Sequence, residues 1–531
     1  MTAPQAQADT TTAPAAEPPR PRASVPVAAL ALAQTLGARL DGDGDVVLEG
    51  VTLDSRSVVA GDLWCALPGA HAHGADFAAQ AASRGAAAAL TDAAGEAPCR
   101  EAGLTVLVSE DPRRDTARAS ATVYATDRRR PVTIGVTGTN GKTSITTMVH
   151  ETLQELGYSS GVIGTAGTAY RDAAGREHRI RTVRTTPEAP ETHGILARMA
   201  EAEVAFCAME VSSHAMVLHR ADEILFDVVC FTNLSQDHLD FHGDMEHYFA
   251  AKASLFTPAH ARAAVICVDD AWGRRLAAQT PLPTVTYATL PGVEADVRAE
   301  DLRVGAASGG LGTAFAAVGR DGARHELVSP LPGRHYVANT IAVALLLDAL
   351  GLPVESTAAS ITRSAVVPGR MEQVAETPVR GVVDYSHTED SLVQALTTLR
   401  ALPGTRRLLV VMGAGGDRDR AKRPLMGAAA ARLADAVVVT DDNPRSEDPA
   451  SIRRAVLGGI PADSPAEVHE VADRGEAIAR AVRLAGPGDT ILVAGKGAET
   501  GQDVGGSILP FDDREHLRTA LARAAQEGHA C

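Results

Sequence analysis

Short runs made up mostly of apolar residues recur along the chain, each bounded by glycine or polar residues and separated by helix-length stretches. Apolar runs without alternation are typical of strands that are buried on both faces of a parallel sheet. In the middle of the chain these runs are 132–136, 204–209, 226–231 and 263–268, and in the last third they are 381–383, 407–412, 436–440 and 490–494. The pattern predicts an α/β protein with mostly parallel sheets and helices on both faces.

The same pattern, with changes in composition, predicts where domains begin and end. Residues 1–23 are rich in Ala, Pro, Thr and Gln with little to bury, so we expect a disordered tail. Residues 24–128 alternate short apolar runs with Ala-rich helical stretches and form a first α/β domain, which ends at a charged linker. We expect a central domain over 129–366 and a carboxy-terminal Rossmann-like domain over 367–531.

Composition limits the function classes. The chain has 531 residues, of which 45% are hydrophobic, and a formal net charge of -16, which argues against general binding to nucleic acid or anionic membranes. Six cysteines without a CxxC pair indicate neither disulfides nor a zinc site. The segment 20–33 has the arginines and apolar run of a secretory signal, but it also fits a first amphipathic helix, and no cleavage-type ending follows cleanly. We expect a cytoplasmic protein without stable membrane insertion.

A glycine-rich segment, Gly135-Val-Thr-Gly-Thr-Asn-Gly-Lys-Thr-Ser144, connects the first central strand to a helical pattern over 145–156. Glycines at such a turn allow backbone N–H groups to face phosphate oxygens, and the helix N-terminus favours negative charge. Lys142 would counter the phosphate charge and Thr143 would place its hydroxyl on magnesium. The alternative is a glycine-rich turn without a ligand.

Residues Gly138–Thr143 resemble the ATP loop of the Mur ligases and of the related folylpolyglutamate synthetases. The resemblance implies that a carboxylate is phosphorylated by ATP before an amine attacks it. It also implies ATP contacts across the central and carboxy-terminal domains: Gly138, Thr139, Asn140, Gly141, Lys142, Thr143, Ser144, Asn339, Arg370, Asp384, Tyr385 and His387.

Four further central segments, 185–188, 209–214, 233–243 and 248–252, are similar to those of the Mur ligases that add the third amino acid. The second and third follow buried strands, at the sheet edge where α/β proteins bind ligands. The resemblance implies a catalytic set of Lys142, Glu210, His238 and Lys252, and two Mg²⁺ ions held by Thr143, Glu210, His238 and a carbamylated Lys252. It implies contacts to a UDP-muropeptide from Ser55, Thr185, Thr186, Ser212 and Arg220. Taken singly, each residue also fits an ordinary structural role.

The segment Asp441-Asp-Asn-Pro-Arg445 resembles the Asp-Asn-Pro-Arg motif of the family members that add diaminopimelate. An arginine fork suits the carboxylate that distinguishes diaminopimelate from lysine. The resemblance implies a diaminopimelate site of Arg418, Asp442, Asn443, Pro444, Arg445, Gly495 and Glu499. The alternative interpretation of 443–445 is a simple turn.

The resemblance covers about 24–521 and implies that the protein uses ATP, diaminopimelate and UDP-N-acetylmuramoyl-L-alanyl-D-glutamate. Separately, we expect a monomer, although the sequence itself does not indicate an oligomeric state. The chain departs from the family pattern at a few sites: Leu218, His335, Tyr336, Ser386, Glu389 and Ala498. Three alternatives stay open: a paralogue that adds another amino acid such as lysine, a ligase for a non-murein acceptor, and a nucleotide-binding regulator without catalysis.

Overall fold

The computed structural model describes residues 19–69, 71–305, 312–364 and 367–526. Its internal contacts divide the chain into two compact units. The first is Met1–Val132 with Tyr158–Cys207 and Leu218–Ile224, and the second holds Thr133–Gly157, Ala208–Val217 and Leu225–Cys531. A segment of the predicted central domain therefore clusters with the amino-terminal residues, while the three-domain boundaries stay a prediction.

The amino-terminal part of the first unit is a five-stranded sheet in the order β2-β7-β6-β5-β4. The strands β4 to β7 are parallel and β2 is antiparallel to β7. Apolar side chains cover both faces, with α1 and α4 on one side and α2 and α3 on the other. The elements are β1 Val27–Ala28, α1 Ala29–Leu36, β2 Arg39–Asp41, β3 Val47–Leu48, β4 Gly50–Thr52, β5 Asp62–Cys65, η1 Gly74–Phe77, α2 Ala78–Ser83, β6 Ala88–Thr91, α3 Glu96–Glu101, β7 Thr105–Val108 and α4 Pro112–Val123.

Later residues complete the first unit. The strands β9 Ser160–Gly164, β10 Gly167–Arg171 and β11 Glu177–Ile180 form an antiparallel meander. Helix α6 Ala189–Glu201 packs on α4, and its Ala197 joins the apolar core of the amino-terminal sheet. The first residues of α6 form a capping box, in which Glu188 and Glu191 satisfy free backbone N–H groups.

In the second unit, the strands run in the order β8-β13-β14-β15-β16-β17-β18, parallel up to β16 and antiparallel beyond. The expected mostly parallel sheet is confirmed, and each predicted central run forms a strand. The elements are β8 Val132–Thr137, α5 Lys142–Glu155, β12 Phe206–Glu210, α7 Ser213–Val217, β13 Val228–Phe231, α8 Leu239–His242, α9 Met245–Ala253, β14 Ala264–Cys267, α10 Ala271–Gln279, β15 Thr284–Ala288, β16 Val297–Val304, β17 Thr313–Gly319, β18 Arg324–Ser329, α11 Arg334–Ala349 and α12 Val354–Arg363.

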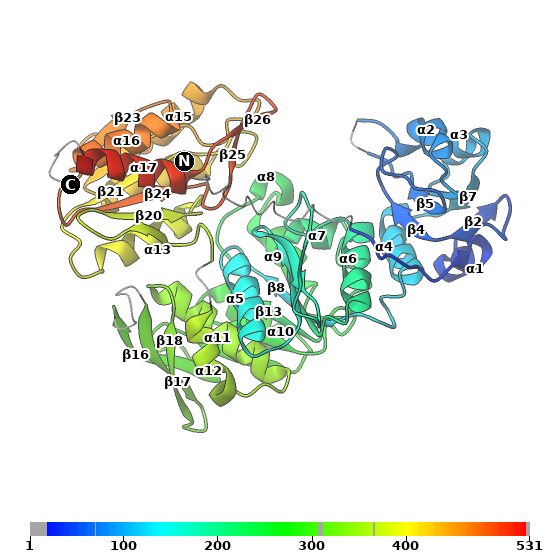
Figure 1. Cartoon of the computed structure of the whole chain (residues 1–531), viewed down its shortest axis with the longest axis horizontal. Coiled ribbons are helices and arrows are strands. Elements are labelled where there is room, and N and C mark those ends of the chain that lie inside the picture. The colour runs from blue at the N-terminus through cyan, green and yellow to red at the C-terminus, as the bar shows by residue number, and fades with distance from the viewer. Residues whose placement is uncertain (1–18, 70, 306–311, 365–366, 527–531) are drawn as a thin grey trace, which may run out of the picture. The chain divides into compact units, whose positions relative to one another are not determined.

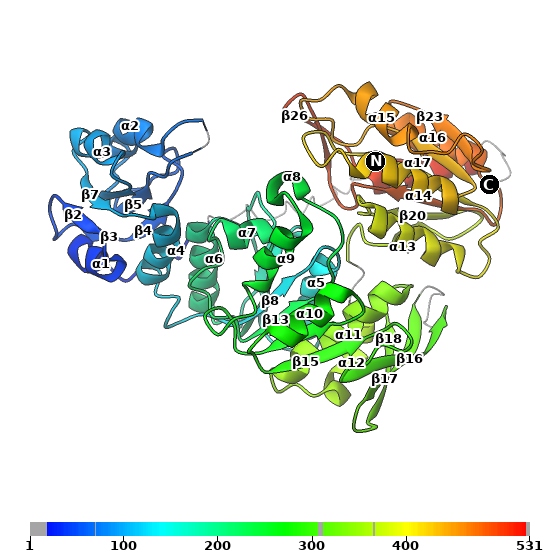
Figure 2. The same cartoon turned by 180° about the vertical axis from the view of Figure 1, so that it is seen from behind.

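The carboxy-terminal part of the second unit is a six-stranded sheet, in the order β19-β20-β24-β21-β22-β23, that is parallel except for β19. Figures 1 and 2 show its helices on both faces, and two apolar clusters fill the space between. The elements are β19 Glu372–Ala375, β20 Arg380–Asp384, α13 Glu389–Arg400, β21 Leu408–Met412, α14 Lys422–Leu433, β22 Ala436–Val439, α15 Pro449–Leu457, β23 Glu467–Glu470, α16 Arg474–Leu484, β24 Thr490–Ala494, β25 Gly501–Val504, β26 Ser507–Pro510 and α17 Asp513–Gln526.

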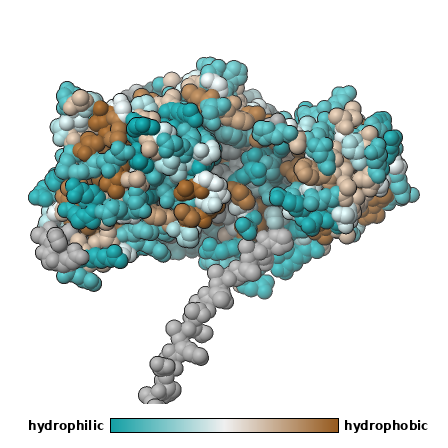
Figure 3. Space-filling view, turned by 90° about the horizontal axis from the view of Figure 1, so that it is seen from above, coloured by the Kyte–Doolittle hydropathy of each residue, from teal (hydrophilic) through white to brown (hydrophobic). Residues whose placement is uncertain are grey.

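The surface is mainly hydrophilic, with scattered hydrophobic residues on the face that Figure 3 shows. Within the described ranges, no helix is both long enough and apolar enough to cross a membrane. The predicted disordered tail, 1–23, lies outside the described residues except for 19–23, whose contacts are given below.

Candidate active site

The glycine-rich loop between β8 and α5 takes a backbone shape that glycine accepts most readily. Gly138 has a φ of +144° and Gly141 a φ of +93°. A Cβ added to Gly138 would lie 1.9 Å from the hydroxyl oxygen of Thr232, so the loop also packs closely on the turn after β13. Lys142 is the first residue of α5, whose N-terminal end carries free N–H groups and positive partial charge. This loop therefore has the features of a phosphate site.

The ammonium group of Lys142 lies over this loop. It donates to the carbonyl oxygens of Gly138 and Thr139, each at 2.9 Å. Burial lowers the pKa of Lys142, while the nearby carboxylates of Glu210 and Asp237 act in the opposite direction. The charge of this lysine therefore interacts with two acids, Glu210 at the end of β12 and Asp237 beyond β13, the two strands that flank β8.

A second lysine reaches the same loop from α9. Lys252 is 1% exposed, and its Nζ donates to the Gly138 carbonyl at 2.8 Å and lies 4.6 Å from the centre of the Tyr248 ring. Burial, and then the charge of Lys142, lower the pKa of Lys252 well below its usual value. Because two ammonium groups on one carbonyl would repel each other, Lys252 is suited to carry a neutral, nucleophilic amine.

Asp237 is a buried acid close to three basic side chains near the phosphate loop, and the sequence analysis did not name it. Its carboxylate lies 3.4 Å from Nε2 of His238 and 3.9 Å from both Nε2 of His387 and Nζ of Lys422. Burial opposes ionisation, but these three groups lower the pKa of Asp237 below its usual value. The segment 233–243 was the available signal, since Asp237 lies inside it.

The strand end that carries Glu210 meets the phosphate loop directly. The N–H of the next residue, Val211, donates to the Val136 carbonyl of β8 at 2.8 Å, and Glu210 itself is 1% exposed. Beyond it, the ring of His214 lies 4.8 Å from that of His238, and burial lowers the pKa of His238. Glu210 and His238 therefore both lie near the Lys142 ammonium group, while their catalytic and metal-binding roles stay a prediction.

Arg370 joins the loop to the carboxy-terminal part of the unit. Its Nη2 donates to the hydroxyl oxygen of Thr143 at 3.1 Å, and its guanidinium lies 4.3 Å from the centre of the Tyr385 ring. The carboxylate of Asp384 accepts from the N–H groups of Met371 and Ser386, at 2.7 and 2.9 Å. The two oxygens of Asp384 thus hold the turns that carry Arg370 and Tyr385.

A cavity of about 750 Å³ adjoins the loop, and its wall includes Asn140, Gly141 and the predicted nucleotide residue Asn339. Asp390, at the start of α13, also lines it and accepts from the Asn140 amide at 3.0 Å. The remaining wall is mixed apolar and polar, and Tyr287 contributes an aromatic side chain. Such a lining suits a nucleoside whose phosphates lie on the loop.

The predicted amino-acid residues gather at the ends of β22 and β24. The Asn443 amide donates to Glu499 at 2.9 Å, and the buried Lys496 donates to both side chains, at 3.0 and 2.8 Å. A Cβ on Gly495 would lie 2.6 Å from Asp442, so this glycine permits a close approach. Lys496 was not predicted, although it lies between the predicted residues Gly495 and Glu499.

Arg445, which follows Pro444, has a φ of +52° and is half-buried. Its Nη1 donates to the Gly416 carbonyl at 2.6 Å. A Cβ on Gly415 would lie 2.9 Å from Nη1 of Arg445 and 3.8 Å from Cγ of the exposed Arg418. Both predicted arginines therefore lie next to the same glycine, Gly415.

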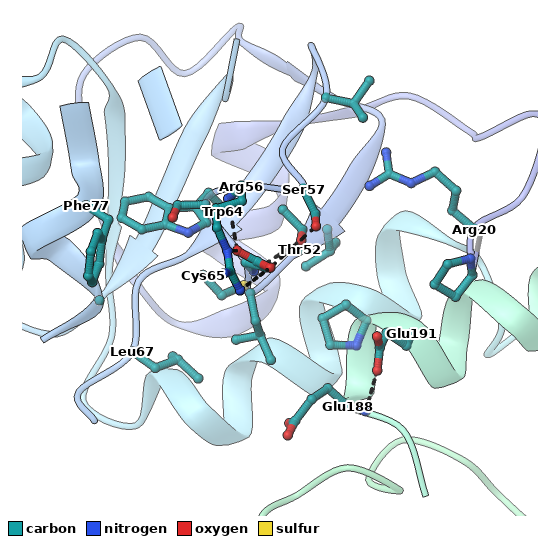
Figure 4. A pocket seen from close by; sticks show the side chains of 18 of the residues that line it. Arg20, Thr52, Arg56, Ser57, Trp64, Cys65, Leu67, Phe77, Glu188 and Glu191 are labelled. Carbon is teal, nitrogen blue, oxygen red and sulfur yellow. Dashed lines mark hydrogen bonds and ion pairs between the residues drawn. The ribbon is translucent and has the colours of Figure 1, made fainter. Parts of the chain in front are cut away.

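The first unit contains a separate cavity of about 1300 Å³ (Figure 4). Its walls come from 19–20, 51–80, 113–124 and 181–191. Ser55 lines it and donates to the Gln80 side chain at 2.7 Å. The mixed polar, charged and aromatic lining suits a large polar ligand.

The other predicted muropeptide residues have different surroundings. The hydroxyls of Thr185 and Thr165 lie 2.9 Å apart, and the Thr186 carbonyl accepts from Arg220 at 3.5 Å. Ser212 belongs to the second unit, where its hydroxyl accepts from the Ala215 N–H at 3.2 Å.

Glu188, inside the predicted segment 185–188, is surrounded by arginines. Its carboxylate lies 2.8 Å from Arg113, 3.0 Å from Arg220 and 3.5 Å from Arg184. Three cations around one carboxylate leave local positive charge, which favours an anionic ligand. The pairing of Arg113 with Glu188 was beyond sequence reasoning because 75 residues separate them.

Metal binding by side chains alone has little support. Across the described parts of the chain, no three His, Cys, Asp or Glu residues gather closely enough to hold a metal ion. Mg²⁺ commonly takes one or two carboxylates and completes its shell with water and phosphate oxygens. Glu210 and the Thr143 hydroxyl, both at the phosphate loop, fit that kind of partial site.

Three sequence profiles match the chain. They are described as Mur ligase family, catalytic domain, over residues 47–132; Mur ligase middle domain, over 136–347; and Mur ligase, glutamate ligase domain, over 369–497.

Named relatives match nearly the whole length. The chain is 46% identical to the UDP-N-acetylmuramoyl-L-alanyl-D-glutamate--2,6-diaminopimelate ligase of Streptomyces coelicolor, over 95% of this chain and 98% of that protein. It is 44% identical to the protein of the same name from Corynebacterium glutamicum, over 90% and 92%. A solved structure of a ligase of this name has a TM-score of 0.63 and 31% identity, covering 95% of this chain and all of that chain.

Proposed function

The chain belongs to the Mur ligase family, and we propose that it joins diaminopimelate to UDP-N-acetylmuramoyl-L-alanyl-D-glutamate while ATP is converted to ADP and phosphate. The observation that carries this proposal is the near-full-length similarity to ligases of that name, which includes the Asp442–Arg445 segment. The contacts of the second unit supply the physical argument for each part of the reaction.

ATP would bind with its phosphates on the loop 138–144 and its nucleoside in the adjoining cavity. The proposal is supported by the free N–H groups at the start of α5 and by Lys142, which lies over the loop. The Lys142 ammonium would exchange its contacts with loop carbonyls for phosphate oxygens. Asn339 lines the cavity and Arg370 contacts Thr143. These two residues would contact the nucleotide together with Asp384, Tyr385 and His387.

Thr143, Glu210, His238 and a carbamylated Lys252 would hold two Mg²⁺ ions. When bound, such ions supply charge neutralisation for phosphoryl transfer. Carbamylation is supported by the burial of Lys252 and by its lowered pKa, because only a neutral amine combines with carbon dioxide. The product is a carboxylate that would remove the repulsion between Lys252 and Lys142.

In the proposed reaction, the γ-carboxylate of the D-glutamate attacks the γ-phosphorus of ATP and ADP leaves. The acyl phosphate so formed carries a good leaving group, which a free carboxylate lacks. The amine of diaminopimelate then attacks the acyl carbon, phosphate leaves and the amine loses a proton. Lys142 would offset the negative charge on the transferred phosphoryl group.

Selection of diaminopimelate is assigned to Arg445 and Arg418, which would pair with its distal carboxylate. Asn443 and Glu499 would bind the amino-acid end of diaminopimelate, and Lys496 would hold the side chains of these two residues in place through hydrogen bonds. At the other substrate, Ser55, Thr185, Thr186, Ser212 and Arg220 would contact the UDP-muropeptide. We further propose a cytoplasmic monomer that binds these small molecules and no nucleic acid.

The test is ADP release from the purified full-length protein with the UDP-dipeptide and, in turn, diaminopimelate, lysine, ornithine or glutamate. We expect turnover with diaminopimelate and about 10⁴-fold less turnover with lysine, because lysine lacks the distal carboxylate that would pair with the two arginines. Arg445→Met should lose most of this preference, whereas Arg454→Met, which removes an exposed arginine on α15, should not. Turnover with lysine alone would indicate a paralogue, and no turnover with any acceptor would indicate a regulator.

A further inference from the structure

The segment 19–23 forms a strap that is tied to two elements of the first unit. The N–H groups of Arg22 and Ala23 donate to the Glu201 carboxylate on α6, at 2.9 and 2.8 Å. A Cβ on Gly194 would lie 2.3 Å from the Pro19 carbonyl oxygen, so the strap runs directly against α6 where a glycine leaves room. These contacts place Pro19 and the next residue at the large cavity.

Arg20 is the cation that the strap brings to the cavity wall. Its Nη1 and Nη2 each lie 3.2 Å from one carboxylate oxygen of Asp62, and Asp62 is 2% exposed. One Asp62 oxygen also accepts from the Val59 N–H at 2.9 Å. This acid is therefore fixed, and it fixes the plane of the guanidinium in turn.

Arg20 keeps donors for a ligand. A guanidinium has five N–H donors, and two of them contact Asp62. Among the residues described by the structure, the Arg20 side chain has no other hydrogen-bond or ion-pair partner. Figure 4 shows this side chain extending from the strap toward the side of the cavity where Thr52 and Ser57 lie. The remaining donors are available to an anion in the cavity.

The other cations of the cavity differ from Arg20 in their setting. Arg56 is mostly exposed and pairs with its neighbour Asp54. Arg113 and Arg184 share the Glu188 carboxylate. The fifth arginine of the wall, Arg181, is exposed. Among these five described arginines, Arg20 is the one held by an acid as buried as Asp62, which is the arrangement of a pre-organised anion contact.

We propose that Arg20 recognises the diphosphate of the UDP-linked substrate, and that the strap 19–23 holds it in the cavity for that purpose. The inference rests on the proposed function, which supplies an anionic nucleotide-linked substrate. It adds a specificity residue that lies in the stretch the sequence analysis assigned to a tail. Losing one charged contact of this kind should weaken diphosphate binding about 10- to 100-fold.

The test compares two probes, UDP and uridine, that differ only in the diphosphate. Trp64 lines the cavity and is one of two tryptophans, so tryptophan emission from the full-length protein can report binding of either probe. Arg20→Met should weaken UDP binding about 10- to 100-fold and leave uridine binding nearly unchanged. Arg22→Met is the matched control, because Arg22 is exposed and absent from the described cavity wall.

Each outcome decides the question. Equal UDP binding by the wild type and a folded Arg20→Met variant would overturn the inference, as would an equal loss of UDP and uridine. If Arg20→Met is unstable, Arg20→Lys replaces it in the test, because lysine retains a positive charge beside Asp62. The Arg20→Lys variant should bind UDP more weakly than the wild type and bind uridine equally well. Wild-type protein that binds neither UDP nor UDP-N-acetylmuramoyl-L-alanyl-D-glutamate would overturn the proposed function itself, and the inference with it.

Discussion

Replacing Asp513 with asparagine should break the most buried ion pair of the carboxy-terminal sheet region. Asp513 and Arg474 are both fully buried, and two hydrogen bonds of 2.7 Å join their side chains. Arg474 also donates to the Ala494 carbonyl at 3.0 Å, at the end of β24. The pair therefore connects α16 and α17 to the strand end that precedes Gly495.

The expected loss of unfolding free energy is about 3–5 kcal/mol, because asparagine removes the nearest counter-ion of the buried Arg474 charge, and the Asp442 carboxylate, 3.9 Å away, offsets that charge only in part. Burial alone would lower the pKa of Arg474, but the carboxylates of Asp513, and then of Asp442 and Glu499, outweigh it and the pKa is raised. Urea unfolding followed by circular dichroism measures the loss. The KM for diaminopimelate should also rise, since Arg474 lies 3.9 Å from Asp442.

Two further variants sharpen this test. Glu476→Gln on α16 removes a pair with Arg483 in which both side chains are about half exposed, and it should cost less than about 1 kcal/mol. The double variant Arg474→Met with Asp513→Leu should recover part of the loss, because it also removes the buried arginine charge that Asp513→Asn leaves behind. A loss below about 1 kcal/mol for Asp513→Asn, equal to that of the surface control, would refute the reasoning.

Three other changes test the loop, the amino-acid site and the core of the first unit. Gly138→Ala should raise the KM for ATP at least about 10-fold, because the added Cβ would clash with the Thr232 hydroxyl and because alanine is strained at the φ of Gly138. The control is Gly157→Ala, which also has a positive φ but has open space around the added Cβ, and it should leave the KM for ATP unchanged. Lys496→Met should raise the KM for diaminopimelate about 10-fold and leave that for ATP unchanged, because it removes the donor shared by two site residues. Burial lowers the pKa of His193 to about 4, so stability is fully present above about pH 6.5 and falls by about 3 kcal/mol as the pH drops toward 4. His193→Gln should remove that part of the acid sensitivity in urea unfolding at pH 7 and pH 4.5.

Each of these has a result that would contradict it. An unchanged ATP KM in Gly138→Ala would show that the loop tolerates a side chain. Equal shifts for ATP and diaminopimelate in Lys496→Met would indicate a general loss of structure. A wild-type slope between pH 6.5 and 4 that persists in His193→Gln would assign the acid sensitivity to other groups.

The buried strands and the phosphate loop were predictable because their signals are local. The run 490–494 is buried along its whole length, and after Thr490 every residue is apolar, so the position of the strand follows from the sequence. The glycines of 138–141 mark a turn whose shape few other residues accept. The half-exposed strand β16 has no such run, and its antiparallel pairing with β17 was not predicted.

Contacts between distant residues were not predictable from patterns of this kind. Arg20 and Asp62 lie 42 residues apart, and Arg474 and Asp513 lie 39 apart. Each residue taken singly resembles an ordinary charged surface position, and only the fold pairs it. Asp237 and Lys496 differ, since Asp237 lies inside the selected segment 233–243 and Lys496 lies between the predicted residues Gly495 and Glu499; both are charged residues that the fold buries.

The packing of α6 on the amino-terminal sheet has a consequence for dissecting the molecule. Ala197 of α6 shares an apolar core with residues from α1, β4 and α4, and the same helix anchors the strap through Glu201. A fragment ending at the linker near residue 128 would expose that apolar face to water and lack part of the cavity wall. Chimeras between relatives would therefore need to exchange 158–207 together with the amino-terminal residues, even though the two stretches are separated in the gene by the phosphate loop.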